Sequence, residues 1–200
     1  MMLPTHAVVG LAVAAPLLLV APDHAAVALG GALLGSVLPD LDMYAGHRRS
    51  LHYPTGYTIV AAPAAVIAGV LRTPLSVAVA FLLVGAALHC RMDRYGGGLE
   101  LRPWEATSDR AVYDHARGRW RSPKRWIRYD GAPEDVLLVV VLGIPLVAVL
   151  DAPFQWFAAA ALGVGVTYGA LRRRLANLAP TVFASAPEPL ADHVPERYRR

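Results

Sequence analysis

The amino-acid sequence predicts an all-α protein, a polytopic membrane helical bundle of about six segments. Three observations support this fold class. Hydrophobic residues make up 56% of the chain and charged residues only 17%, whereas charged residues are about a quarter of an ordinary soluble domain. The mean hydropathy is +0.41. Six stretches contain no Asp, Glu, Lys or Arg, namely residues 1–22, 25–39, 53–71, 73–90, 136–150 and 152–171.

The lengths of these stretches decide how each one relates to a membrane. A spanning helix needs about 17 to 25 apolar residues, and four of the stretches are that long. Stretches 25–39 and 136–150 are shorter, so they either span with help from flanking residues or form buried half-helices. No Lys or Arg precedes Arg48, so we expect the first stretch to be a retained helix rather than a cleaved signal peptide.

The other residues divide the chain into a domain, an insert and a tail. Residues 1–175 form the expected membrane-embedded domain, and a basic cytoplasmic insert occupies 94–133. Residues 176–200 are rich in Pro, Ala and charge, which predicts a disordered C-terminal tail with His193 as a bystander. Cys90 is the only cysteine, so it cannot form an intramolecular disulfide and is expected to be a small packing residue.

The distribution of basic residues predicts how the bundle is oriented. If all six segments cross, the connections after the second and fourth lie on the same side as both termini. Of the 19 Lys and Arg residues, Arg72 alone falls on the other side. The positive-inside rule therefore predicts a multi-pass protein of the inner, cytoplasmic membrane with both termini in the cytoplasm. The same reasoning brings eight ionisable residues to the cytoplasmic face: His6, Asp40, Asp42, His47, His52, His89, Asp93 and Glu134.

The spacing of these residues predicts a metal centre. A proline is expected to end the second helix, so Asp40 and Asp42 would be alternate residues of an extended segment and point to one centre. His89 and Asp93 are four apart on a helix and therefore share one face. Polar side chains beside long apolar runs are costly unless a metal ion or a substrate compensates them.

The chemistry of the eight candidate ligands indicates which ions they would hold. Imidazole nitrogens with carboxylate oxygens suit zinc first, with manganese or iron as alternatives. Eight ligands oversupply one ion, so two or three per chain are expected. Clustered ions activate water and clamp a phosphoryl centre, which predicts hydrolysis of a phosphoester, with a lipid ester among the candidates. Asp42 or Asp93 is the candidate general base, and Arg48 is suited to an anionic phosphate oxygen.

Simpler interpretations stay open for each residue taken singly. His6 is also typical of a hydrogen-bonded helix-end histidine, an Asp after a proline is commonly a cap, and Arg48 with Arg49 would serve as topology determinants. Two other functions remain alternatives. A metal or proton transporter would need ionisable groups near mid-membrane, and a non-catalytic scaffold or regulatory protein would carry a closed, structural metal site.

The motif residues resemble the YdjM-like family of membrane-bound metal-dependent hydrolases, described as LexA-binding and inner-membrane-associated. The resemblance covers roughly residues 5–150. Its elements run in order: His6, then LLGSVLPDLD with Asp40 and Asp42, GHRRSLH with His47, Arg48 and His52, LHCRMD with His89 and Asp93, GGGLELRPW, and Glu134. It implies a metal-dependent hydrolase, remotely similar to zinc-dependent phospholipase C and the single-strand-specific P1-type nucleases. Leu51 and Tyr53 stand where family members usually have Thr and Ser, so substrate specificity does not transfer.

The basic insert is also rich in aromatic residues, with Trp104, Tyr113, Trp120, Trp126 and Tyr129 among its arginines. This composition is typical of a surface at the lipid headgroups, where cations and aromatic rings both gather. Membrane lipids and an anionic phosphoester substrate are therefore the expected partners. A substrate lid is an alternative, and nucleic-acid binding is disfavoured because no recognised module is present. Within the insert, Asp114 and His115 are expected to be solvated.

Overall fold

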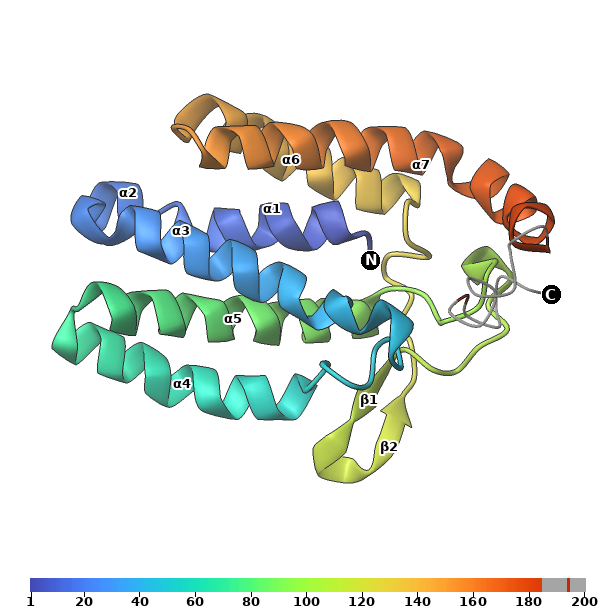
Figure 1. Ribbon diagram of the computed structural model, residues 1–200, viewed down its shortest axis with the longest axis horizontal. Coiled ribbons are helices and arrows are strands. Elements are labelled where there is room, and N and C mark those ends of the chain that lie inside the picture. Colours follow the sequence, from blue (N-terminus) through green and yellow to red (C-terminus); the bar gives the residue numbers. More distant parts are fainter. Residues whose placement is uncertain (185–193, 195–200) are drawn as a thin grey trace.

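The all-α class is confirmed by the computed structural model, which describes residues 1–184 and Val194 (Figure 1). Every apolar stretch forms a helix, and successive long helices run back and forth across the bundle. The helices are α1 (Leu3–Ala14), α2 (Leu17–Val20), α3 (Pro22–Val37), α4 (Pro54–Leu71), α5 (Pro74–Tyr95), α6 (Pro133–Val149) and α7 (Phe154–Ala184). The connections contain the 3₁₀ helices η1 (Leu38–Tyr44), η2 (Pro103–Glu105) and η3 (His115–Arg117), and the strands β1 (Val112–Asp114) and β2 (Arg119–Arg121).

Five helical segments are long and apolar enough to cross a membrane: Leu3–Val20, Pro22–Met43, Pro54–Leu71, Pro74–Tyr95 and Phe154–Ala184. The second of them contains the apolar stretch 25–39, which by itself is short for a membrane-spanning helix. Helix α3 ends just before Pro39, as predicted. The chain nevertheless continues helically through η1, which extends this segment to 22 residues. Helix α6 has 17 residues and lies alongside α7 in the same bundle (Figure 1).

The surface of the bundle is apolar, as expected for helices that face lipid. Ile59, Val66 and Leu75 on α4 and α5, and Trp156 on α7, are all exposed. The helix interfaces, in contrast, are built largely from small residues such as Ala and Gly. Because lipid tails are as apolar as the side chains, membrane helices associate through close packing rather than through water exclusion.

The closest of these interfaces joins α3 to α5. A methyl group at Gly35 would overlap the backbone carbonyl of Leu82, and one at Gly85 would overlap the carbonyl of Ala32. Only glycine allows two backbones to approach so closely. The two helices therefore hold their polar ends, which follow Gly35 and Gly85 along the chain, at a fixed separation.

One end of the bundle collects η1 and the loop after it, the end of α5, the insert and the start of α6 (Figure 1). Arg72 lies in the connection between α4 and α5 at the opposite end. Helix α7 continues to Ala184, so residues 176–184 of the predicted tail are helical. The rest of that tail, including His193, lies outside the described residues.

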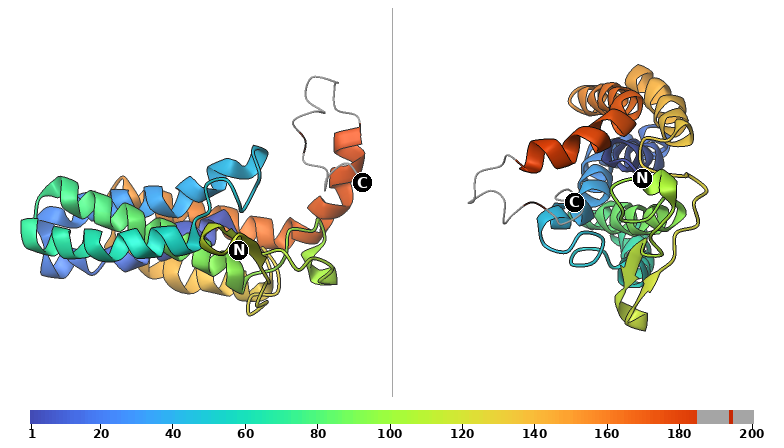
Figure 2. Two further views of the ribbon diagram at one scale, coloured as in Figure 1. Left: turned by 90° about the horizontal axis from the view of Figure 1, so that it is seen from below. Right: turned by 90° about the vertical axis from the view of Figure 1, so that its right-hand side faces the viewer.

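The insert is an ordered part of the polar end. Strands β1 and β2 pair as an antiparallel hairpin that projects beside the start of α4 (Figures 1 and 2). The chain then returns to the end of α5. There the backbone N–H groups of Lys124 and Ile127 donate to the carbonyls of Arg94 and Tyr95, at 2.7 and 3.1 Å.

Candidate metal centre

Four of the eight predicted ligands form one compact cluster at the polar end. Asp40 comes from η1, His52 from the loop before α4, and His89 and Asp93 from the last turns of α5. One ligand atom from each residue lies within 4.8 Å of all the others. Three of the residues are buried, and only the side chain of Asp40 is partly exposed, at 17%.

His89 is oriented by a backbone carbonyl. Its Nδ1–H donates to the carbonyl oxygen of Ser36 at 2.7 Å, and a carbonyl can only accept, so this nitrogen carries the proton. The opposite nitrogen, Nε2, is buried and has no hydrogen bond to any described residue. It lies 3.3 Å from Oδ1 of Asp40 and 3.5 Å from Oδ2 of Asp93. A buried polar atom without a partner is unfavourable unless something else binds it, which a metal ion would do.

His52 is oriented by a carboxylate. Its Nδ1 lies 2.9 Å from Oδ2 of Asp42, and its Nε2 lies 3.2 Å from Oδ2 of Asp93 and 3.6 Å from Oδ1 of Asp40. Metal-ligating histidines characteristically donate their second N–H to a carboxylate or a backbone carbonyl. His52 has the first kind of partner and His89 the second.

Four of the six distances between the ligand atoms of the cluster are close to those around a tetrahedral ion. A regular tetrahedron of ligands about 2.0–2.1 Å from zinc separates neighbouring ligand atoms by about 3.3–3.4 Å. The four distances between the imidazole Nε2 atoms and the carboxylate oxygens are 3.2, 3.3, 3.5 and 3.6 Å. The donor set and its spacing therefore suit a divalent metal ion.

Asp42 does not point to the same centre as Asp40, although the sequence predicted that it would. It is buried, and its two oxygens accept from the imidazoles of His47 and His52 and from three backbone N–H groups. The sequence predicts an extended segment at residues 40–42, but these residues form a 3₁₀ helix. With three residues per turn, positions i and i+2 do not share a face, so Asp40 faces the cluster while Asp42 organises the loop.

Two further predicted ligands lie beside the four. The His6 ring stacks on His89 with the ring centroids 3.8 Å apart, and its Nε2 lies 3.2 Å from Oδ1 of Asp93. His47 is 20% exposed at the open side, with Nδ1 at 3.2 Å from Asp42 and 3.8 Å from Asp40. Both residues therefore contact carboxylates of the candidate cluster.

Glu134 is not brought to the cluster. It lies at the surface, where Arg128 donates to both carboxylate oxygens at 2.6 and 3.1 Å. The neighbouring Asp135 is the buried residue, and it accepts from the Thr5 hydroxyl at 2.6 Å and from the Met2 N–H at 2.9 Å. Adjacent helical residues point about 100° apart. The prediction that Glu134 faces the interior is therefore wrong, and the neighbouring Asp135 faces the interior instead.

Arg48 is buried against the cluster. Its Nη1 donates to the carbonyl of Gly97 at 2.9 Å, and its Nε lies 3.4 Å from Oδ2 of Asp93. The backbone of Arg48 is left-handed, with φ of 60°, and its N–H donates to Asp42. Arg48, which the sequence suggested for phosphate binding, therefore pairs with the carboxylate of Asp93 and holds the insert through the carbonyl of Gly97.

The surroundings of His52 shift its pKa in opposing directions. Burial alone lowers the pKa of His52, but hydrogen bonds to Asp42 and Asp93 outweigh burial and raise the pKa above its ordinary value. Metal ligation requires the unprotonated ring nitrogen. A proton and a metal ion would therefore compete for a ring nitrogen of His52.

The insert clamps the loop that carries His52, and the sequence did not reveal this role. The Tyr113 N–H donates to the carbonyl of Arg48 at 2.9 Å, and Nε2 of His115 lies 2.7 Å from the carbonyl of Arg49. His115 is exposed, as predicted. The expectation that Asp114 is solvated is wrong, because its carboxylate is buried.

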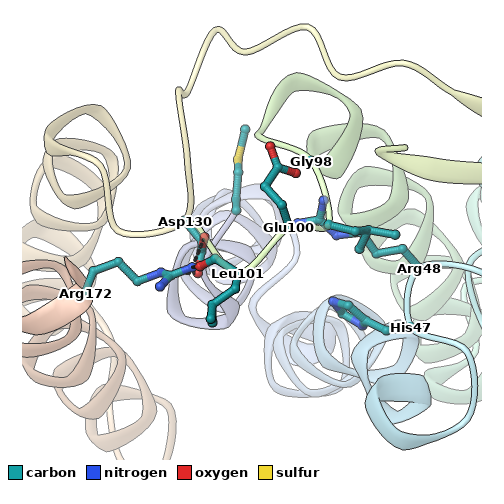
Figure 3. A pocket seen from close by; sticks show the side chains of 9 residues that line it. His47, Arg48, Gly98, Glu100, Leu101, Asp130 and Arg172 are labelled. Atoms are coloured by element: carbon teal, nitrogen blue, oxygen red, sulfur yellow. Dashed lines mark hydrogen bonds and ion pairs between the residues drawn. The ribbon is translucent and has the colours of Figure 1, made fainter. Parts of the chain in front are cut away.

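A small cavity of about 80 Å³ lies beside the cluster (Figure 3). His47 and Arg48 line one wall, and Arg172 with Asp130 line the opposite wall. Arg172 donates to both oxygens of Asp130, at 2.8 and 3.1 Å. Burial alone raises the pKa of Asp130, but Arg172 and a hydrogen bond from Tyr168 outweigh it and lower the pKa. The partly exposed His47 therefore borders a cavity at the open side of the cluster.

Comparison of the chain with protein-family models, with curated proteins and with solved structures finds no match. The fold and site thus define a helical membrane-type bundle with a candidate metal-binding cluster of two Asp and two His residues at one end.

Proposed function

We propose that this chain is a membrane-bound, metal-dependent hydrolase that cleaves a phosphoester. The observation that carries the proposal is the convergence of Asp40, His52, His89 and Asp93, with both imidazoles held by partners on their second nitrogens. A divalent ion held there would activate water and stabilise charge on a phosphoryl group. The resemblance to the YdjM-like family supports the same reaction class.

The chain's own residues have distinct roles in this proposal. Asp42 orients His52, because all its partners are loop donors and the imidazoles of His47 and His52. This role replaces that of general base for Asp42. Asp93 is a ligand, and His47 is the titratable group on the exposed side that is placed to accept a proton. The partly exposed Asp40 marks the side from which solvent and substrate reach the cluster.

We infer one tightly bound zinc ion at the four-residue cluster, in place of the two or three ions that the ligand count suggested. Manganese or iron would use the same ligands but would need more than these four coordination positions. A second ion would have to share Asp40 with His47, whose ligand atoms lie 3.8 Å apart. If the wild-type chain carried two metal ions and the His47→Ala variant lost only one of them, the second ion would be assigned to this pair.

The excess of basic residues at the polar end supports a cytoplasmic orientation of the cluster, in the inner membrane. The substrate would then be an anionic phosphoester at or near the membrane surface, including a phospholipid.

The test is metal content and turnover of the full chain purified in mild detergent. Wild type should carry about one zinc per chain, and His89→Ala and Asp40→Ala should lose it. The matched control is His24→Gln, because His24 lies at the opposite end and contacts the carbonyl of Arg72. Wild type without metal, or undiminished metal in both site variants, would overturn the assignment.

Turnover separates the proposal from its main rival. A panel of phosphomonoesters, phosphodiesters and phospholipids should give hydrolysis that depends on His89 and Asp40. Stoichiometric metal without turnover of any of them would favour a scaffold with a structural ion. Three of the four ligands are fully buried, which is the observation that favours this rival.

A further inference from the structure

A second polar cavity lies on the other side of α5, away from the metal cluster. It has a volume of about 150 Å³ and is bounded by the start of α4, the last turns of α5 and the β1–β2 hairpin. Three arginines line it, Arg91, Arg94 and Arg121, against one carboxylate, Asp114. Such an excess of cations around a partly open cavity favours an anion.

The single carboxylate is already neutralised. Asp114 accepts from the Thr55 hydroxyl at 3.0 Å and pairs with Arg121 at 3.4 Å. Arg117 lies 3.9 Å from the same carboxylate. Asp114 therefore fixes the cavity wall, and its charge is shared between two cations.

Arg94 is the least satisfied of the cations. Its Nε is buried and has no hydrogen-bond partner within the part of the chain that the structure describes. Burial and the neighbouring charges of Arg94 and Arg117 lower the pKa of Arg121, so these guanidinium groups repel one another. A bound anion would relieve that repulsion and accept the buried N–H of Arg94.

The start of α4 supplies a further donor surface. Pro54 and Thr55 line the cavity, and the residue before α4, Tyr53, makes no side-chain cap. The first backbone N–H groups of a helix have no partner within it and carry partial positive charge. Phosphate groups are commonly bound at such helix starts, together with arginine.

We propose that this cavity binds a phosphate-bearing anion, with Arg94 and Arg121 as its principal ligands and the first turn of α4 as a third contact. The positive-inside rule accounts for arginines at this end of the bundle, but not for three of them around one cavity. The inference does not depend on the hydrolase proposal, because none of the cavity residues is a candidate metal ligand.

The experiment measures binding of inorganic phosphate and of soluble dihexanoyl phosphatidic acid to the full chain in detergent, by thermal shift. Arg94→Gln combined with Arg121→Gln should weaken binding about tenfold or more. The matched control combines Arg110→Gln with Arg119→Gln. It removes the same charge from exposed residues of the insert that do not line the cavity, and it should bind as wild type does.

A chelator arm separates this site from the metal cluster. Binding that survives chelation and depends on Arg94 and Arg121 supports the proposal. Binding that is lost with the metal, or that falls equally in both double variants, overturns it, as does no binding of either probe. Binding of both probes identifies a free phosphate group as sufficient, and binding of the lipid alone identifies a headgroup. If the double variant fails to fold, Arg94→Gln alone must still weaken binding.

Discussion

Nδ1 of His52 lies 2.9 Å from Oδ2 of Asp42, an oxygen that also accepts the backbone N–H groups of Arg49 and Leu51. One buried carboxylate therefore sets both the path of the loop and the orientation of the imidazole. The side chain that the sequence suggested as a ligand acts instead through another ligand.

Asp42→Asn should weaken metal binding without abolishing it. The amide retains the shape of the carboxylate but loses the charge that polarises His52, and loss of such a supporting partner typically costs about 10–100-fold in metal affinity. Asp40→Asn should cost more, because it replaces a ligand. Competition with a chelator of known affinity measures both. Equal losses in the two variants would show that Asp42 binds the metal directly.

Gly35→Ala should destabilise the protein and disturb the cluster. The added methyl group meets the carbonyl of Leu82, and forcing apart well-packed elements typically costs about 1–3 kcal/mol. Gly69→Ala is the matched control, because no other element among the described residues comes within 4 Å of its new methyl group and alanine favours a helix. Unfolding temperature and metal content in detergent measure the effect. A Gly35→Ala protein as stable as Gly69→Ala would contradict the close approach of α3 and α5.

Glu134→Gln should leave metal content and affinity unchanged. The residue lies at the surface and its partner is Arg128, so its loss breaks only an exposed ion pair. Metal analysis beside Asp93→Asn provides the comparison. A loss of metal in Glu134→Gln would instead show that Glu134 takes part in metal binding.

Asp130 should contribute to stability in a pH-dependent way. The folded-state pKa of Asp130 is lowered, so its contribution is present above the unfolded pKa of about 3.9 and is lost as the pH falls through the folded value. Unfolding temperatures between pH 7 and pH 3 should therefore fall less steeply in Asp130→Asn than in wild type. The exposed Asp23→Asn should follow the wild-type curve, and parallel curves for Asp130→Asn would contradict the role of its pairing with Arg172.

The helix order and the polar end were predictable because they follow from counting apolar stretches. Each crossing reverses direction, so residues as distant as Asp40 and His89 must reach the same end whatever the side-chain packing. The roles within that end were not predictable, since they depend on local backbone geometry. The 3₁₀ geometry of η1 points Asp40 and Asp42 in different directions, and one helical step at the start of α6 does the same for Glu134 and Asp135.

The partners of the candidate ligands were hidden for a different reason. The carbonyl of Ser36 orients His89, yet a backbone group carries no sequence signal. Asp114 looked solvated because it lies in a charged segment, and its burial arises from contacts with Thr55 and Arg121, which are distant from it in sequence or across the hairpin.

The clamp of the insert on the loop has a consequence for biosynthesis. His52 emerges from the ribosome long before residues 111–115, whose hairpin holds the neighbouring segment in place. Chains fold progressively as they are synthesised, so the first four long helices can be in the membrane while the loop still lacks its support. The hydrogen bonds that hold this loop can therefore form only after more than half of the chain has been made.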